Sequence, residues 1–314
     1  MKRKVSFVIP CYRSEATIKG VVSEIKQVMD LHGDDEYEII LVNDCSPDNT
    51  YDVLKQIASE DSAVTVLDMA RNFGQHAALM AGMRETDGDL VVCLDDDGQT
   101  PANEVYTLID KLDEGYDVVY ASYEHKMHSG FRNFGSRINS IMTEWLLSKP
   151  KDLYISSYFV VRRFVVDEMV KYINPYPYVI GLVLRTTKNI TCVPVTHRDR
   201  EAGVSGYTFS KLLNLWINGF TAFSVKPLRI ATFMGLICAL LGFFYAIYAL
   251  INKMCNPAAP MGWTSMVIIL LILGGMILAV LGLIGEYIGR MYISMNNSPQ
   301  YVIREKISKK EDTL

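Results

Sequence analysis

The chain has 314 residues, 50% of them hydrophobic, and a formal net charge of −4 at pH 7. Because basic residues are not in excess, composition excludes recruitment of nucleic acid by a general positive field, and we expect no nucleic-acid partner. The six cysteines are scattered and form no C-x-x-C pair, which indicates reduced thiols in a cytosolic setting and excludes a disulfide framework.

From Val5 to about Tyr123, short apolar runs alternate with amphipathic patterns. The runs predict strands at Val5–Pro10, Tyr37–Val42, Val64–Asp68, Leu90–Leu94 and Val118–Ala121. The amphipathic patterns predict helices at Ala16–Leu31, Asn49–Ser59, Gly74–Arg84 and Pro101–Glu114. Such alternation is typical of βαβ units, so we expect an α/β fold with a parallel sheet and helices on both faces. The first run is too short for a signal peptide, so we expect this part of the chain to stay in the cytoplasm.

Beyond Arg132 the pattern is less regular. We expect a helix at Ile138–Leu147, a strand at Tyr158–Val161, a helix at Val165–Tyr172 and an extended segment at Ile190–Val195. Thr208–Ser224 forms an amphipathic pattern whose large apolar side chains crowd one side. We predict that this helix lies in the plane of a membrane interface. An ordinary packed core helix is the alternative.

Two long apolar segments follow. Leu228–Ile251 has 24 residues with one charge, Arg229, at its edge, and Trp263–Ile284 has 22 residues with none. Each exceeds the ~20 residues that a helix needs to cross ~30 Å of hydrocarbon. The sequence therefore predicts two transmembrane helices; the apolar core hairpin of a soluble protein is the alternative.

The charges around these segments predict an orientation. The connector Asn252–Gly262 holds one cation, whereas five cations follow from Arg290 onward. The positive-inside rule then puts both termini on the cytoplasmic side of the inner (plasma) membrane. We expect a cytosolic catalytic domain at residues 1–207 and an interfacial helix at 208–226. A two-helix transmembrane hairpin at 227–289 and a cytosolic tail at 290–314 should follow.

An acidic motif, Asp95-Asp96-Asp97-Gly98-Gln99, directly follows the fourth predicted strand. In an open α/β sheet, ligands bind at the carboxyl ends of the strands. Oxygen ligands suit Mg²⁺ or Mn²⁺, and such ions commonly bridge to substrate phosphates. The motif therefore predicts a metal–diphosphate site, with a solvated acidic turn as the alternative.

Three further motifs follow the first three strands: Pro10-Cys11-Tyr12, Asn43 to Thr50, and Arg71-Asn72-Phe73-Gly74. The Asp44 carboxylate is suited to accept a hydrogen bond from a uracil ring N–H, and the Tyr12 ring is suited to stack on a base. The helix N-terminus after Gly74 adds a positive dipole end. On its own, Asp48–Thr50 also fits a simple helix cap. Together the motifs indicate a nucleotide-sugar site.

This set of motifs resembles family 2 glycosyltransferases of the GT-A fold. More narrowly, the chain is similar to the polyprenyl-phosphate glycosyltransferases, which include dolichyl-phosphate mannose synthase and the undecaprenyl-phosphate glucosyl- and aminoarabinose transferases. Lys226–Arg229, which opens the first apolar segment, and Gly282–Tyr292, which closes the second, support the narrower resemblance. The resemblance extends over nearly the whole chain.

The resemblance implies roles for single residues. Contacts to the nucleotide-sugar are implied for Pro10, Tyr12, Glu15, Val42, Asp44, Asp95 and Asp96. The divalent ion, Mg²⁺ or Mn²⁺, is implied to bind Asp95, Asp97 and Gln99. Catalytic roles are implied for Asp97, for Asp152 beside the acceptor, and for Arg200 at the phosphates.

Several positions depart from the family's pattern. Asn43 stands where Asp is usual, and Arg13-Ser14 stands where Asn-Glu is usual, with Glu15 as a substitute. Gly206 and Tyr123 stand where Lys and Arg are usual, so two cations near the phosphates are missing. Candidates for contact with the acceptor phosphate are Lys126, Arg132, Arg137, Arg198 and Ser205.

The implied reaction is inverting, metal-dependent transfer of a sugar from a UDP-sugar to undecaprenyl phosphate, with glucose as first donor sugar and N-acetylglucosamine next. A glycolipid or polysaccharide acceptor, or a non-catalytic membrane scaffold, is the alternative. No G-x-G-x-x-G follows the first strand, which argues against an NAD(P)-dependent oxidoreductase. Two spans are too few for the channel of a processive synthase. The resemblance also allows a homo-oligomer.

Overall fold

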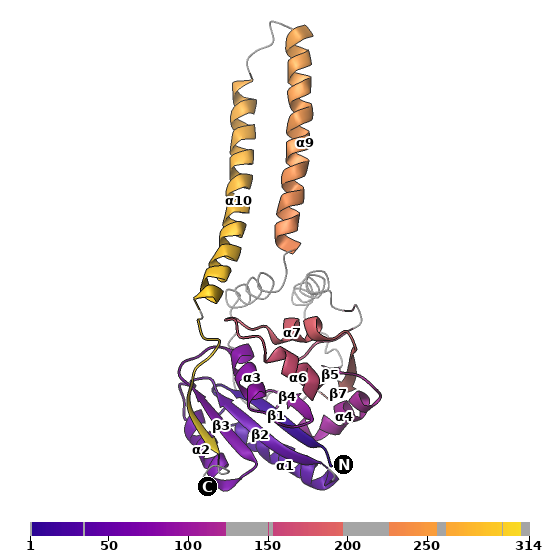
Figure 1. Ribbon diagram of the computed structural model, residues 1–314, viewed down its shortest axis with the longest axis vertical. Coiled ribbons are helices and arrows are strands. Elements are labelled where there is room, and N and C mark those ends of the chain that lie inside the picture. Colours follow the sequence, from indigo (N-terminus) through magenta and orange to yellow (C-terminus); the bar gives the residue numbers. More distant parts are fainter. Residues whose placement is uncertain are drawn as a thin grey trace. The chain divides into compact units, whose positions relative to one another are not determined.

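The computed structural model describes residues 2–33, 35–123, 150, 153–196, 226–255, 262–296 and 298–308 (Figure 1). The chain divides into two compact units. The first runs from Met1 to Asn214 and resumes from Asn297 to Leu314, and the second is Leu215–Asn296. The helices predicted at 138–147 and 208–224 lie outside the described residues.

The first unit contains an eight-stranded sheet with the order β7-β5-β6-β4-β1-β2-β3-β8. The strands are β1 Lys4–Cys11, β2 Glu36–Asn43, β3 Val64–Met69, β4 Leu90–Cys93, β5 Val118–Tyr123, β6 Phe159–Arg162, β7 Ile190–Val195 and β8 Ile303–Ser308. Strands β1 to β4 pair in parallel. The parallel centre of the sheet is therefore as predicted.

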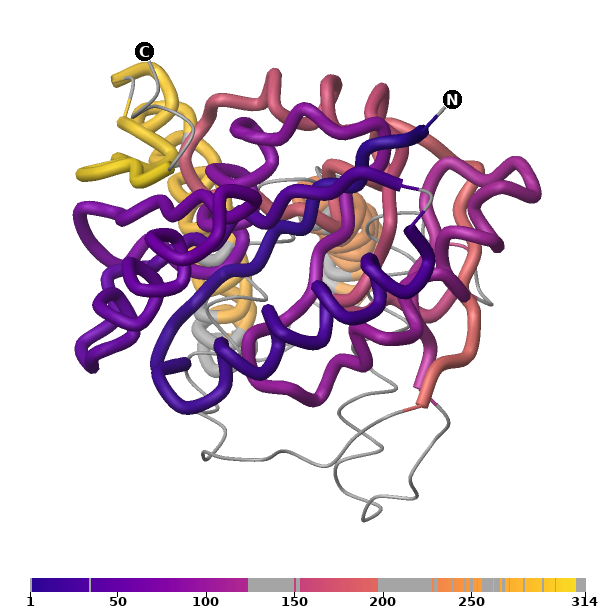
Figure 2. Tube along the Cα trace, turned by 90° about the horizontal axis from the view of Figure 1, so that it is seen from below, coloured from indigo at the N-terminus to yellow at the C-terminus, as the bar shows by residue number. Residues whose placement is uncertain are grey.

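The sheet as a whole is mixed, which corrects the expectation of a parallel sheet. Strand β6 lies antiparallel between β4 and β5, and β8 lies antiparallel on β3. The sequence of β8, Ile-Arg-Glu-Lys-Ile-Ser, has no apolar run and was not predicted as a strand. Charged side chains are typical of edge strands. Strands β8 and β7 form the two edges of the sheet (Figures 1 and 2).

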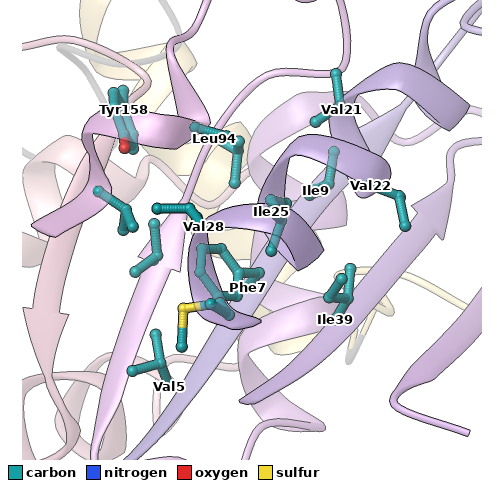
Figure 3. Packing of buried hydrophobic residues seen from close by; sticks show 14 of the residues in the cluster. Val5, Phe7, Ile9, Val21, Val22, Ile25, Val28, Ile39, Leu94 and Tyr158 are labelled. Atoms are coloured by element: carbon teal, nitrogen blue, oxygen red, sulfur yellow. The ribbon is translucent and has the colours of Figure 1, made fainter. Parts of the chain in front are cut away.

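Helices cover both faces of this sheet. In chain order they are α1 Ile18–His32, α2 Thr50–Glu60, α3 Gln75–Arg84, the short 3₁₀ helix η1 Ala102–Glu104, α4 Val105–Asp113, α6 Arg163–Met169 and α7 Val179–Thr186. On one face, Phe7 and Ile9 of β1 belong to a fully buried cluster with apolar residues of α1, α2 and α4. Figure 3 shows Ile25 and Val28 of α1 over Phe7. The predicted apolar stripe of α1 is therefore confirmed.

The opposite face of β1 carries α3. Side chains alternate along a strand, so Val8 points away from Phe7 and meets α3 at Gly82. A Cβ on Gly82 would lie 2.4 Å from Cγ1 of Val8, so only glycine allows this close approach. The helix is thereby held against β1 and β2 with its N-terminal end at the carboxyl ends of the strands.

The second unit consists, in its described residues, of the helices α9 Lys226–Cys255 and α10 Trp263–Met295. Many of their large apolar side chains are exposed, for example Leu241 and Leu270. Among the residues that the structure describes, one segment, Ile272–Met295, is long and apolar enough, with 24 residues, to cross a membrane. Helix α9 carries a shorter apolar stretch, Ala231–Tyr245. Both predicted apolar segments are helical. That each of the two helices crosses a membrane stays a prediction.

Candidate functional site

The four predicted motifs converge at one edge of the sheet. Strands β4, β1, β2 and β3 are adjacent and parallel, so their carboxyl ends lie side by side. Pro10 is in register with Val42, and Asn43 is in register with Asp68. Pro10 and Val42 are both buried. This is the edge at which α/β folds bind ligands.

Asp44 connects the second motif with the third. It is 4% exposed, and its two carboxylate oxygens accept hydrogen bonds from the backbone N–H groups of Phe73 at 2.7 Å and Gly74 at 2.9 Å. Gly74 has φ 92°, a conformation that side chains rarely adopt. Burial raises the pKa of Asp44, and the two N–H groups partly oppose this shift. A buried carboxylate with lone pairs left over is suited to bind one further N–H donor.

Asn43 has a partner that sequence analysis did not identify. Its Nδ2 donates to Oδ1 of Asp68 at 2.7 Å, and its Oδ1 accepts from the backbone N–H of Ser46 at 3.2 Å. An aspartate at position 43 would oppose the buried Asp68 with a second carboxylate. The contact with Asp68 therefore explains why position 43 has asparagine where the family pattern has aspartate.

Hydrogen bonds join the first motif to the turn 46–50. The backbone N–H of Arg13 donates to Oγ of Ser46 at 2.8 Å, and that of Ser14 donates to Oγ1 of Thr50 at 2.9 Å. Glu15 accepts from the backbone N–H of Asn49 at 3.0 Å, so its carboxylate lies on this turn. Oδ1 of Asp48 accepts from both the N–H and the hydroxyl of Thr50, but the residue at the N-cap of α2 is Asn49, whose side chain makes no capping hydrogen bond.

Tyr12 offers an exposed ring beside these loops. The side chain is 44% exposed, and the Arg13 guanidinium lies 5.6 Å from the ring centroid. Its backbone N–H donates to Oδ2 of Asp96 at 2.9 Å, so the acidic motif orients the first motif. The exposed ring is available for stacking on a base.

The acidic motif is held by contacts from distant parts of the chain. The two oxygens of Asp95 accept from Nε2 of Gln75, at 2.8 Å, and from the hydroxyl of Ser157. Oδ1 of Asp97 accepts from the backbone N–H of Gln99 at 3.1 Å. Burial, together with the charges of Asp97 and Asp96, raises the pKa of Asp95 to about 6, although Ser157 and Gln75 oppose the shift. Negative charge is thus concentrated where the sequence predicts a cation.

The donor set has oxygen atoms alone, as Mg²⁺ and Mn²⁺ prefer. Among the described residues, no three His, Cys, Asp or Glu side chains are grouped so as to hold a metal ion. By the chemistry of their donors, Asp95, Asp97 and Gln99 would suit an ion that takes its other ligands from substrate phosphates and water, rather than one enclosed by protein.

Tyr123, which replaces a cation of the family pattern, lies close to the acidic motif. Burial raises its pKa, and the nearby Asp95 carboxylate contributes to the shift. The ring packs edge-on against Tyr154, with centroids 6.3 Å apart. An aromatic pair thus stands beside the carboxylates.

Several predicted site residues lie outside the part of the chain that the structure describes: Asp152, Arg200, Lys126, Arg132, Arg137, Arg198 and Ser205. Their roles stay predictions. Conversely, Gln75 and Ser157 were not predicted as site residues. Only their contact with Asp95, across 20 and 62 residues of chain, reveals their role.

The chain matches known families along most of its length. A family model described as glycosyl transferase family 2 matches residues 6–170, and one described as GtrB C-terminal hairpin matches residues 226–291. An uncharacterized glycosyltransferase of Bacillus subtilis, YkcC, is 34% identical over 96% of this chain and 93% of that protein. The undecaprenyl-phosphate 4-deoxy-4-formamido-L-arabinose transferase of Proteus mirabilis is 33% identical over 98% of this chain and 95% of that protein.

Solved structures share the fold of the first unit. Glucosyl-3-phosphoglycerate synthase of Mycobacterium tuberculosis, in complex with Mn²⁺, UDP-glucose and phosphoglyceric acid, has a TM-score of 0.52 at 21% identity and covers 69% of this chain and 78% of that chain. Mannosyl-3-phosphoglycerate synthase of Rubrobacter xylanophilus has a TM-score of 0.54 at 17% identity and covers 72% of this chain and 74% of that chain. The predicted GT-A type of fold is confirmed. The chain therefore belongs to glycosyl transferase family 2 and is a glycosyltransferase, with undecaprenyl-phosphate transferases among its relatives.

Proposed function

We propose that the enzyme transfers a sugar from a UDP-sugar to undecaprenyl phosphate. The observation that carries this proposal is the match to relatives named undecaprenyl-phosphate transferases over 98% of the chain. The match includes the C-terminal hairpin, where an apolar helix suits an enzyme whose acceptor stays in a bilayer. The reaction would then take place at the cytoplasmic face of the inner membrane.

The geometry around Asp44 supports a uridine nucleotide as donor. Each carboxylate oxygen of Asp44 accepts one backbone N–H and retains a lone pair for a ring N–H. Tyr12 presents its ring at the same edge of the sheet. The N-terminus of α3, which follows Gly74, adds a partial positive charge favourable to phosphate oxygens.

Asp95, Asp97 and Gln99 would hold Mg²⁺ or Mn²⁺. When bound there, the ion would offset the negative charge that develops on the departing nucleotide. The structure of glucosyl-3-phosphoglycerate synthase, which shares the fold, contains both Mn²⁺ and UDP-glucose. The contacts from Gln75 and Ser157 hold the Asp95 carboxylate in place for this role.

The acceptor needs no strong general base. A phosphate monoester has a second pKa of about 6, so its oxygen is mostly ionised at pH 7. In the proposed step this oxygen attacks the anomeric carbon, the bond to the UDP oxygen breaks, and UDP leaves with the electron pair. Attack opposite the leaving group inverts the anomeric configuration. Cations that position the lipid phosphate are proposed to come from Arg200 and its neighbours in sequence.

Two donor sugars have specific support. Glucose follows from the resemblance to undecaprenyl-phosphate glucosyltransferases in the sequence motifs. The names of several relatives at 32–33% identity favour 4-deoxy-4-formamido-L-arabinose as the second candidate.

A donor panel tests the proposal. The purified full-length chain is incubated in detergent with UDP-glucose, UDP-N-acetylglucosamine, the UDP-linked formamido-arabinose or GDP-mannose, each with and without undecaprenyl phosphate. We expect UDP release and a lipid-linked sugar with one UDP-sugar, only when the lipid is present. Transfer that ignores the lipid, or that runs with GDP-mannose alone, would refute the proposed substrates.

A further inference from the structure

Strand β8 lies at the edge of the sheet, next to β3 (Figures 1 and 2). The loop that follows β3 contains Phe73 and Gly74, which bond to Asp44. It pairs antiparallel with β3, with Glu305 opposite Asp68 and Ile303 opposite Met69. Arg304 has no partner in this register, so the pairing is irregular at this residue. Such bulges re-aim side chains and are frequent next to active sites.

The Arg304 side chain makes two hydrogen bonds to β3 and the loop after it. Nη1 donates to Oδ2 of Asp68 at 3.1 Å, and Nη2 donates to the backbone oxygen of Ala70 at 2.8 Å. The Asp68 carboxylate is 2% exposed, whereas the Arg304 side chain is 57% exposed. The guanidinium therefore covers a buried carboxylate from the solvent side.

From these two contacts, one path of hydrogen bonds leads to the residue before Asp44, and one stretch of backbone leads to the N–H groups that Asp44 accepts. The first runs from Asp68 to the amide of Asn43, the residue before Asp44, and on to the N–H of Ser46. The second starts at Ala70, in the loop whose Phe73 and Gly74 donate both N–H groups to the Asp44 carboxylate. The guanidinium thus contacts the loop after β3 directly and reaches the loop after β2 only through Asp68 and Asn43.

A second contact of β8 supports this bracing role. Glu305 accepts a hydrogen bond at 2.6 Å from the hydroxyl of Tyr51, in the first turn of α2. That turn directly follows the loop 43–50. Two adjacent residues of β8 therefore contact the elements around Asp44: Arg304 contacts β3 and the loop after it, and Glu305 contacts the start of α2.

We propose that Arg304 is a positioning residue that holds Asp44 in register for nucleotide binding. The inference rests on the proposed function of Asp44 as a nucleoside ligand. Two bonds from a planar guanidinium fix Asp68, which holds Asn43, and the loop after β3 at once, an arrangement that a single ammonium group does not reproduce. Loss of Arg304 leaves the Asp68 carboxylate without its cation and removes one of the two hydrogen bonds that hold Ala70, whose backbone N–H still donates to Val302 at 2.8 Å, so the Asp44 carboxylate is less well aligned.

The test compares three variants of the full-length chain in detergent. UDP affinity is measured by calorimetry, KM is measured for donor and for lipid, and the midpoint of thermal unfolding is recorded. Lys306→Gln is the matched control, because Lys306 lies on the same strand but bonds to Glu85 at 2.9 Å, at the end of α3. We expect Arg304→Gln to raise the Kd for UDP about tenfold and the donor KM similarly. The lipid KM and kcat should change less than about twofold.

Arg304→Lys distinguishes positioning from strand stability. We expect a partial effect on UDP affinity, about threefold, with an unchanged melting temperature, because lysine keeps the charge but bonds only one of the two acceptors. Lys306→Gln should leave the Kd within twofold of wild type. If Arg304→Gln does not fold, the Arg304→Lys result decides.

Two outcomes overturn the inference. One is wild-type affinity for UDP in the Arg304→Gln variant. If that variant does not fold, wild-type affinity in the Arg304→Lys variant has the same meaning. The other is an equal loss of affinity in Lys306→Gln, which would show a general effect of the strand. Failure of the wild-type chain to bind UDP is a different result, since it refutes the proposed donor itself.

Discussion

Asn43 donates a hydrogen bond from Nδ2 to Oδ1 of Asp68 across 2.7 Å, where the parallel strands β2 and β3 end side by side. Both side chains are buried. Asn43 and Arg304 donate to different oxygens of Asp68, and Oδ1 of Asn43 accepts from the backbone N–H of Ser46. One neutral side chain thus connects the edge of the sheet to the loop that would bind the nucleoside.

Asn43→Asp is expected to weaken both stability and UDP binding. The change sets two carboxylates at hydrogen-bonding distance in a buried position, and like charges in such a place destabilise by about 1–3 kcal/mol. Thermal unfolding and calorimetric UDP binding measure the two effects. The exchange variant Asn43→Asp/Asp68→Asn restores one amide and one carboxylate, and it should recover stability relative to the single variant. A single variant as stable as wild type contradicts this account.

Asp97→Ala is expected to abolish transfer without unfolding the protein. The loss of a group that stabilises charge in the transition state costs on the order of 10²–10³ in rate. Chelation by EDTA should have the same effect on the wild-type chain, and added Mg²⁺ or Mn²⁺ should reverse it. Lipid-dependent UDP release measures the rate, and Asp110→Ala, on the exposed side of α4, is the control. Full activity in EDTA would remove the metal from the mechanism.

The parallel core of the fold was predictable because buried parallel strands are near-continuous apolar runs. Val5–Pro10 and Leu90–Leu94 are such runs, and the motifs at their ends could be assigned to one edge of the sheet from the βαβ alternation alone. Local pattern was sufficient here because parallel strands joined by helices all have their carboxyl ends at the same edge of the sheet, whatever their order in it; β4, for example, lies next to β1 rather than β3.

Contacts between distant residues were not predictable in the same way. Strand β8 is polar, and it becomes a strand by pairing with β3, more than 230 residues earlier in the chain. Ser157 and Gln75 hold Asp95 only because β6 and α3 pack beside β4 and β1, which no spacing in the sequence reveals. The antiparallel insertion of β6 was missed for the same reason.

His76 is expected to make stability depend on pH. Burial lowers the pKa of His76 to about 4 from an ordinary value of 6.5, and its Nδ1 has no hydrogen-bond partner among the described residues. The unfolded chain therefore binds a proton at a pH where the folded protein does not. This contribution to stability is fully present above pH 6.5 and is lost as the pH falls toward 4, to an extent of about 2–3 kcal/mol.

The His76→Phe variant isolates this contribution. Phenylalanine keeps an aromatic ring against Tyr178, whose centroid lies 5.1 Å from the imidazole, and it cannot be protonated. The melting temperature of the wild-type chain should fall more steeply than that of the variant between pH 7 and pH 4.5. Parallel pH profiles for the two proteins would show that His76 is not buried in its neutral form.

Gly82→Ala is expected to destabilise the protein and to disturb the nucleotide site. The new Cβ would meet Cγ1 of Val8 at 2.4 Å, so α3 must move away from β1, and overpacking of this kind costs about 1–3 kcal/mol. Because α3 begins at Gln75, which bonds to Asp95, the displacement should also lower turnover. Gly20→Ala is the matched control: nothing lies within 4 Å of its Cβ position on α1, and alanine there should stabilise the helix by about 0.5–1 kcal/mol. Thermal unfolding of both variants separates the two cases, and a Gly82→Ala variant that melts at or above the wild-type temperature would contradict the close packing of α3 on β1.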